Sequence, residues 1–470
     1  MSVSFSGLAS GVNTTKYLEA IMAQEKLPLN RLEEKKEITK VYQNVFKSLN
    51  TKLLALKDAA TALSDLGSFQ MSKASTSDAT KLTASAQSTA IAGEYSVVIN
   101  SLAQKHVVAS KSFDDSASYD SSGLPSQLSV NGETIDLSQL DLSGKTMGEA
   151  LSVIAGKINS LEDAGVQAAV IQTSNGQKSL VLTSKDYGEA NEIIFDTSAS
   201  WGFTEKQEAK DAHLKVNGLD IYSSTNTVKD AIPGVTLTLS NTGASTVKVE
   251  QDVDGITSKV EAFVKAYNDI INTIKENTPK STENEDGSLS LTLQGDPMLR
   301  SLRIQLGDMM NNIVGDSKGF KLLSDIGLEV DKGITSASLM TGNITFDKAK
   351  FKEKMLENPE LVEKMFKSAT AVKDDGTTEG IDGIATIFKN SMKEWTDSVD
   401  GIVTSKIKGY DSEISFLNEQ IQSMSDRLDL KEASLKRKFV NMEVVMTQLN
   451  SQKDWITNQL SVLTKSLSSK

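Results

Sequence analysis

The C-terminal residues 410–470 contain no glycine and no proline. Since nothing in this stretch interrupts a helical backbone, it can form a single helix on the order of 90 Å long at about 1.5 Å per residue. Its apolar residues recur at alternating spacings of four and three, the pattern of a left-handed coiled coil. The first set is Tyr410, Ile414, Leu417, Ile421, Met424 and Leu428. A helix of this length is not stable alone, so its apolar seam needs a partner.

The seam changes phase near Met442, which we interpret as a four-residue stutter. Beyond the shift the apolar positions are Met446, Leu449, Ile456, Leu460, Leu463 and Leu467. Trp455 lies within this second set. Two interpretations of Trp455 stay open, a bulky packing residue or an anchor to another subunit.

The opposite end of the chain predicts a second long amphipathic helix. Asn13 or Thr14 can cap its first turn, and Pro28 predicts a kink or a restart because it removes a backbone donor. The apolar face comprises Leu18, Ile21, Met22, Leu29, Tyr42, Phe46, Leu49, Leu53, Leu56, Ala60 and Leu63. We expect the two ends to pack on each other or on neighbouring subunits. We also hypothesise that residues 1–45 and 410–470 become ordered only against neighbours, because their seams lack internal partners.

Between residues 72 and 254 the hydrophobic period changes to that of strands. Segments such as 95–99, 180–183 and 235–239 are short, rich in Val, Thr or Leu and bounded by Gly, Asn, Asp and Ser. The pairs Asn131-Gly132 and Asn217-Gly218 predict tight hairpin turns, because both residue types tolerate positive φ.

The two Asn-Gly turns lie in similar segments, residues 128–135 and 214–221. Each is followed by a Thr-led segment that we expect to be helical, residues 146–161 in the first copy and 227–232 in the second. Closing strands are expected at residues 166–171 and 235–239. The pattern indicates a repeated β-rich module.

After Gly255 a helical stripe returns from Ile256 to Ile274, and another helix is expected over residues 297–314. With strands inserted between helical ends, the expected fold is α+β and multidomain. The expected domains are a terminal coiled-coil domain (1–45 and 410–470), a mainly helical domain (46–75 and 255–409), a β-rich domain (76–110 and 211–254) and a second, variable β-rich domain (111–210).

Composition excludes several chemistries. The chain has no cysteine, which rules out a thiolate nucleophile, an iron–sulfur cluster, a Cys-liganded zinc and a disulfide framework. Two histidines are too few for a multi-His metal site, and a net charge of −12 argues against nucleic-acid binding. There is no signal-peptide pattern in residues 1–7, and no stretch of about 18 apolar residues that predicts a membrane span.

Five local candidates for a catalytic, nucleotide or metal site have simpler explanations. Residues 143–146 (Ser-Gly-Lys-Thr) lack the first glycine of a phosphate-binding loop, so a turn before a helix is expected. The acidic clusters 283–287 and 374–376 lack the alternation of an EF-hand loop. His106 and His213 have no G-x-S-x-G or H-E-x-x-H context. We therefore expect no enzymatic activity, no cofactor and no metal.

Several motifs in order resemble the bacterial flagellar filament-capping family, also described as flagellar hook-associated protein 2. Residues 6–14 (Ser-Gly-Leu-Ala-Ser-Gly-Val-Asn-Thr) resemble the family's opening, with Val12 where Leu is usual. Residues 214–239 are similar to the small module of hook and flagellin-like proteins. The later matches are Ile21-Met22, Glu25, Pro28-Leu29, Leu293–Asp296, Leu299–Leu302, Leu323–Leu328, Ile344–Asp347, Met365-Phe366 and Met446–Gln452. The resemblance is weakest over residues 110–210.

The resemblance implies a structural cap at the distal tip of the flagellar filament. Such proteins form a ring, usually a pentamer, with β-rich head domains as a plate and helical legs reaching the filament. The ring prevents loss of exported flagellin and promotes its folding and insertion. The implied partners are further copies of the chain, flagellin, the hook–filament junction protein and a cytoplasmic export chaperone at the C-terminal helix. The implied location is extracellular, after leaderless flagellar export, which a cysteine-free chain suits.

The resemblance and the seams together assign oligomer and filament contacts to the helical ends. The residues are Leu18, Ile21, Met22, Tyr410, Ile414, Leu417, Ile421, Met424, Leu428, Leu449, Trp455, Ile456, Leu460 and Leu463. Two alternatives stay open: a hook–filament junction or flagellin-like axial subunit, and a surface adhesin that uses the β-rich head domains for cell adhesion.

Overall fold

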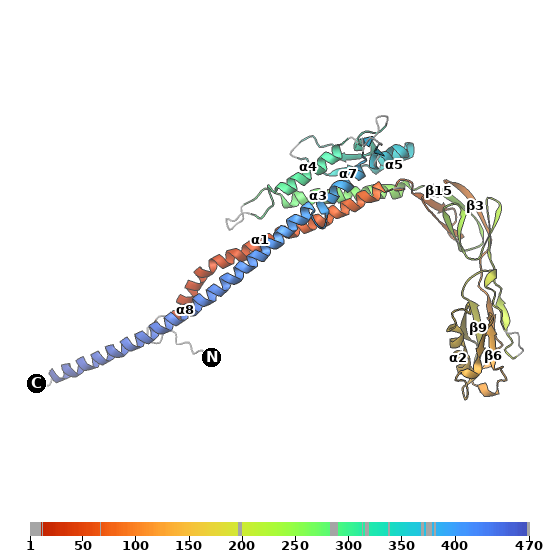
Figure 1. Ribbon diagram of the computed structural model, residues 1–470, viewed down its shortest axis with the longest axis horizontal. Coiled ribbons are helices and arrows are strands. Elements are labelled where there is room, and N and C mark those ends of the chain that lie inside the picture. Colours follow the sequence, from red (N-terminus) through yellow and green to blue (C-terminus); the bar gives the residue numbers. More distant parts are fainter. Residues whose placement is uncertain are drawn as a thin grey trace. The chain divides into compact units, whose positions relative to one another are not determined.

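A computed structural model describes most of the chain (Figure 1). The described residues are 11, 13–65, 67–195, 200–282, 290–312, 314, 319–336, 339–367, 371–372, 378–379 and 382–467. They form two compact units, Met1–Asp65 with Thr257–Lys470, and Leu66–Ile256. The first unit is mainly helical and the second is built mainly from strands, so the predicted α+β fold class is confirmed.

The helical unit brings both ends of the chain together. Its helices are α1 (Thr14–Ser64), α3 (Val253–Asn277, of which the residues from Thr257 belong here), α4 (Pro297–Asn311), α5 (Lys348–Glu357), α6 (Pro359–Phe366), α7 (Ile384–Thr396) and α8 (Ile402–Leu467). Two antiparallel strand pairs also belong to this unit: β16 (Leu328–Val330) with β17 (Ile344–Phe346), and β18 (Ala371–Val372) with β19 (Thr378–Glu379).

The two long helices differ in detail from the sequence expectations. The Asn13 side chain caps α1 by accepting from the Lys16 amide at 3.0 Å, as predicted. Pro28 lies inside α1 and the helix continues past it, so the predicted restart is wrong. A proline inside a helix costs roughly 3 kcal/mol, and the packing of α1 along its length offsets this cost. Helix α8 begins at Ile402, so Gly409 lies inside it rather than before it.

Aromatic and aliphatic side chains form the core of the helical unit. The buried Phe388 of α7 packs its ring edge-on against Phe263 of α3 at 5.1 Å between centroids, and against Tyr267 at 6.0 Å. The Trp395 indole N–H of α7 donates to Gln305 Oε1 of α4 at 2.8 Å. Helix α1 adds a buried stripe of Phe46, Leu49, Leu53, Leu56, Ala60 and Leu63. Elements distant in sequence therefore share one core.

The core continues along α1 to the start of α8. The rings of Phe46 and Tyr410 lie 5.7 Å apart, and the Lys406 ammonium lies 5.5 and 5.2 Å from their centroids. Burial raises the pKa of Tyr410 to about 12, and the negative charges of Asp296 and Glu413 add to the shift.

The strand unit contains two β-rich parts, each with its own core. The first has the antiparallel sheet order β1 (Ser72–Thr76), β15 (Gly243–Gln251), β3 (Gly93–Ser101), β11 (Ala212–Val216), β12 (Leu219–Ser223). A three-stranded sheet of β13 (Thr227–Ile232), β14 (Val235–Leu239) and β2 (Leu82–Ala86) shares its core. The predicted Asn217-Gly218 turn joins β11 to β12 with φ of 50° and 85°, so it is confirmed.

The second part surrounds helix α2 (Met147–Asn159). Its sheet order is β10 (Thr204–Gln207), β4 (Val107–Ala109), β9 (Gln177–Ser184), β5 (Phe113–Asp114), with β8 (Val166–Ser174) also paired to β9. A hairpin of β6 (Gln127–Val130) and β7 (Glu133–Asp136) turns at Asn131-Gly132, as predicted. The buried face of α2 packs into this core through Leu151, Ile154 and Ile158.

The predicted repeat is only partly correct. In the first copy residues 147–159 form α2, and Thr146 and Glu149 make a reciprocal capping box. In the second copy Thr227–Ile232 is strand β13, so the predicted helix there is wrong. Six residues are too few for a stable helix, whereas pairing with β14 satisfies their backbone groups. The shared unit is therefore an Asn-Gly hairpin with a later strand.

We predict that Phe388→Ala destabilises the helical unit alone. Removing a fully buried ring from between α3 and α7 should cost about 3–5 kcal/mol. Pulse-labelling hydrogen exchange across a urea series reports the unfolding midpoint of each unit. The matched control Phe416→Ala, at a ring that is 57% exposed, should shift the midpoint little. An equal shift of both units in Phe388→Ala would contradict the separate cores.

The half-buried phenol of Tyr410 predicts a raised phenol pKa that an alkaline titration can detect. Because the folded-state pKa is raised, Tyr410 stabilises the fold below pH 10, and this contribution is lost as the pH rises through about 12. The absorbance at 295 nm is titrated for the native chain and for the Tyr410→Phe variant. The difference between the two curves should show one phenolate transition near pH 12. A difference transition at the ordinary tyrosine pKa of about 10 would show that Tyr410 is solvated.

Candidate functional site

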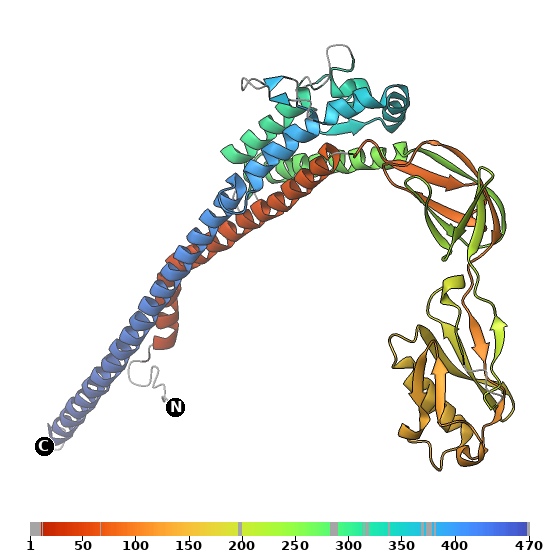
Figure 2. The ribbon, with the colours of Figure 1, turned by 45° about the vertical axis from the view of Figure 1, so that its right-hand side comes forward.

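The terminal helices α1 and α8 lie side by side in antiparallel register (Figure 1, Figure 2). Glu25 pairs with Lys431 at 3.3 Å, and Lys35 with Glu413 at 3.1 Å. Gln43 donates from Nε2 to Asp411 Oδ1 at 2.5 Å. Interactions between the two chain ends therefore recur along the length of the helix pair.

The first part of the predicted α8 seam lies within this pair. Leu417 and Leu428 are 2% and 5% exposed, and Met22 of α1 is 5% exposed. The residues Leu18, Tyr410, Ile414, Ile421 and Met424 are half-buried, while Ile21 is 36% exposed. The hypothesis that the seams lack an internal partner is therefore wrong for this part, because the antiparallel return of the chain supplies one.

The second part of the seam extends past the start of α1. Continued to Thr14, the register of the Glu25–Lys431 and Phe46–Tyr410 pairs reaches about residue 442, whereas α8 runs to Leu467. The remainder of α8 is on the order of 40 Å long. We call residues 440–462 the α8 overhang. Its predicted contact residues are exposed: Leu449 by 52%, Trp455 by 64%, Ile456 by 51% and Leu460 by 57%. The side chain of Leu463 lies outside the described residues.

Several exposed apolar residues lie off the one helical stripe on which the predicted contacts were placed. On the overhang these are Val440, Val444, Val445 and Val462, which are 52–62% exposed. At about 100° per residue, Val440, Val444, Trp455 and Val462 fall within an arc of roughly 60°. A helical-wheel count over residues 440–462 could have found this second arc.

The overhang is also poor in charge. Its only charged residues are Glu443, Lys453 and Asp454, whereas residues 402–439 of the same helix carry many. A contiguous apolar surface with so little charge marks an interaction site more often than a plain solvated face.

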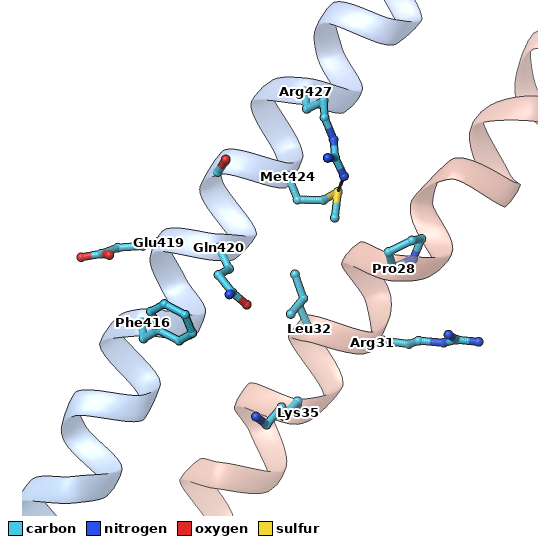
Figure 3. A pocket seen from close by; sticks show the side chains of 10 residues that line it. Pro28, Arg31, Leu32, Lys35, Phe416, Glu419, Gln420, Met424 and Arg427 are labelled. Carbon is cyan, nitrogen blue, oxygen red and sulfur yellow. Dashed lines mark hydrogen bonds between the residues drawn. The ribbon is translucent and has the colours of Figure 1, made fainter.

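A groove runs between α1 and α8 where Pro28 stands opposite Met424 (Figure 3). It has a volume of about 650 Å³. Pro28, Leu32, Phe416 and Met424 supply apolar surface, and Arg31, Lys35, Glu419, Gln420, Ser423 and Arg427 supply the polar lining. An adjoining hollow of about 460 Å³ extends past Pro28 to Gln24, Glu25, Leu428 and Lys431. The small proline ring leaves the pair open here.

The two histidines have structural roles. His106 is 2% exposed and accepts at Nδ1 from the Ile193 amide at 2.7 Å. His213 stacks on Tyr222 at 4.5 Å between ring centroids and bonds Asp220 at 2.7 Å, which lowers the pKa of that carboxyl. Each ring is held by groups of its own surroundings, so the two do not make one site.

The other candidates were a phosphate-binding loop at residues 143–146 and two acidic clusters. Gly144 donates to Asp120, and Thr146 caps α2, which confirms the predicted turn before a helix. The acidic clusters 283–287 and 374–376 lie outside the described residues. Among the described residues, no three His, Cys, Asp or Glu side chains are grouped to hold a metal. In the same part of the chain, no helix is long and apolar enough for a membrane span.

Known proteins match nearly the whole chain. Residues 10–106 and 209–451 match the families described as flagellar hook-associated protein 2 N-terminus and C-terminus. The flagellar hook-associated protein 2 of Escherichia coli (strain K12) is 28% identical over 97% of this chain and 98% of that protein. The A-type protein of Pseudomonas aeruginosa is 27% identical over 98% of both chains.

A solved structure agrees with these matches. The crystal structure of the D1-D2-D3 domains of the flagellar cap protein FliD from Escherichia coli is 26% identical, with a TM-score of 0.55. It covers 78% of this chain and 99% of that chain. The resemblance of the terminal motifs is thereby confirmed, and the chain belongs to the flagellar hook-associated protein 2 family of flagellar cap proteins.

Proposed function

We propose that this protein forms a homo-oligomeric ring at the distal tip of the flagellar filament, retains exported flagellin there and promotes its folding and insertion. The observation that carries the proposal is the α8 overhang, a helix whose apolar residues extend past the antiparallel pair that folds the chain ends. A surface of this kind supports assembly with other chains rather than chemistry within one.

The energetics of the overhang favour assembly. Burying Leu449, Trp455 or Ile456 against another chain contributes roughly 1.5–3 kcal/mol per side chain. Several such contacts per copy offset the entropy lost on association. No covalent step is needed, because retention and insertion require only that the ring bind the successive states of flagellin with different affinities.

The number of copies in the ring, the roles of the domains, the partners and the location are part of the same proposal. We propose the ring to be a pentamer, with the terminal coiled coil as legs and the two β-rich domains as heads, at the boundaries expected from the sequence. Its other partners are flagellin, the hook–filament junction protein and an export chaperone that covers the C-terminal helix before leaderless export. The extracellular tip is the proposed place of action, where the chain acts as a structural protein and not as an enzyme.

We predict that Leu417→Asp with Ile421→Asp separates α1 from α8. Leu417 is 2% exposed and Ile421 is half-buried, so carboxylates at these positions lose much of their solvation without gaining a partner. Peptides of both helices should therefore lose protection from hydrogen exchange while residues 66–256 keep theirs. Cells carrying this variant should release flagellin monomers into the medium. The matched control Asn418→Asp with Gln422→Asp adds the same charge on the exposed side of α8. Normal filaments from the seam variant would contradict the proposal.

The overhang gives a prediction that separates assembly from folding. Trp455→Asp with Ile456→Asp changes only exposed side chains, so the thermal midpoint of the free subunit should stay the same. Flagellin should nevertheless be lost to the medium, and electron microscopy should show filament tips without rings. Rings at the hook–filament junction, or incorporation along the filament, would indicate an axial subunit instead.

A further inference from the structure

We propose that the α8 overhang of one copy lies as a third helix along the groove of the α1/α8 pair in a neighbouring copy. This inference rests on the proposed homo-oligomer and names the two surfaces that meet in it. Both surfaces are present on every copy, and the fold keeps them apart within one chain.

Separate exposed apolar side chains flank the groove on both helices. On α1, Tyr17 and Ile21 are 59% and 36% exposed, and their helical positions place them within about 40° of Pro28 in the groove. On α8, Phe416 and Leu430 are 57% and 71% exposed and stand two heptads apart, on one face. A single chain therefore exposes apolar side chains beside the groove on both of its helices.

The dimensions suit a helix of the length of the overhang. Residues 440–462 span roughly 35 Å, and the lining of the groove from Phe416 to Lys431 spans roughly 22 Å of α8. The overhang cannot reach its own groove, because α8 is continuous from Ile402 to Leu467 and Trp455 stands roughly 58 Å along it from Phe416. The occupant has to come from another molecule.

Charge complementarity favours this occupant. Arg31 and Arg427 line the groove, and the Lys35 beside them already pairs with Glu413. A guanidinium group stacks well on an indole ring and pairs with a carboxylate. The overhang presents Trp455 directly after Asp454. Its weak net charge and apolar arcs match a groove with apolar surface, whose edges carry Arg31, Lys35 and Arg427 against the single carboxylate of Glu419.

The contact is heterologous, because the overhang of one copy meets a different surface on the next. Heterologous contacts propagate from copy to copy and close into a ring when the rotation allows it. Each copy would then donate one overhang and accept one. Pairing of overhangs with each other would instead give an isologous dimer.

The absence of cysteine allows a direct test on the full-length chain. A Ser451→Cys variant, whose side chain lies near the Val444 and Trp455 arc, is labelled with benzophenone-maleimide and mixed with the unlabelled ¹⁵N-enriched native chain. After photolysis, mass spectrometry should find cross-links from Ser451→Cys to residues 17–35 or 416–431 of the ¹⁵N copy. The matched control Thr457→Cys lies roughly 140–160° around the helix from Val444 and Trp455 and should give about tenfold fewer cross-links.

Three results would overturn the inference. Cross-links confined to residues 440–462 of the other copy would show overhang–overhang pairing, and cross-links confined to residues 66–256 would show a different interface. If sedimentation shows oligomers but no cross-link reaches the groove, the groove assignment fails while the proposed oligomer stands. If sedimentation shows no self-association at any concentration, both proposals fail.

A second variant tests the accepting surface. Phe416→Asp with Leu430→Asp alters exposed side chains, so the helix pair should stay folded by circular dichroism. Self-association should weaken about tenfold or more, as for loss of buried apolar contacts in an interface. Unchanged self-association of this folded variant would contradict the groove as the accepting site.

Discussion

The antiparallel packing of α1 on α8 is the interaction on which the rest of the helical unit depends. A helix of 66 residues with one apolar seam is unstable in water unless that seam is covered. The N-terminal helix returns along it and buries Met22, Leu417 and Leu428. This pairing also joins the two chain ends around everything between them, so the β-rich segments become an insertion in a helical framework. Helix α8 continues past the point where α1 begins. The part of α8 beyond that point is the overhang.

The exposed apolar residues of the overhang and the groove reduce the solubility of the free subunit but favour its assembly. Apolar residues exposed on a free subunit favour unspecific association, yet they supply the affinity of a specific one. Few charges oppose burial of residues 440–462, and the polar lining around Pro28 and Met424 limits how a partner helix can lie. A third helix from a neighbouring copy would satisfy both surfaces and direct the copies into a closed ring.

Much of the fold was predictable because it follows from local rules. Heptad spacing predicted both long helices, and the Asn-Gly pairs predicted two hairpin turns whose positive φ values the structure contains. The segment 227–232 was wrongly expected to be helical because pairing with β14 outweighs its local pattern. The division of the α8 seam into a paired part and an exposed part was not predictable, since it depends on where α1 begins relative to α8. Exposed residues such as Phe416 and Val440 were missed because they lie off the main stripe.

The central claim is that residues 410–428 fold within the free subunit, whereas the exposed apolar side chains of residues 440–462 are covered only on assembly. Peptide-level hydrogen exchange of the full-length chain, measured once as the free subunit and once in the assembled state, tests it most directly. The account predicts strong protection of residues 410–428 in both states, and fast exchange of residues 440–462 that slows on assembly. Equal protection of the two segments in the free subunit, or an overhang whose exchange does not change on assembly, would contradict it.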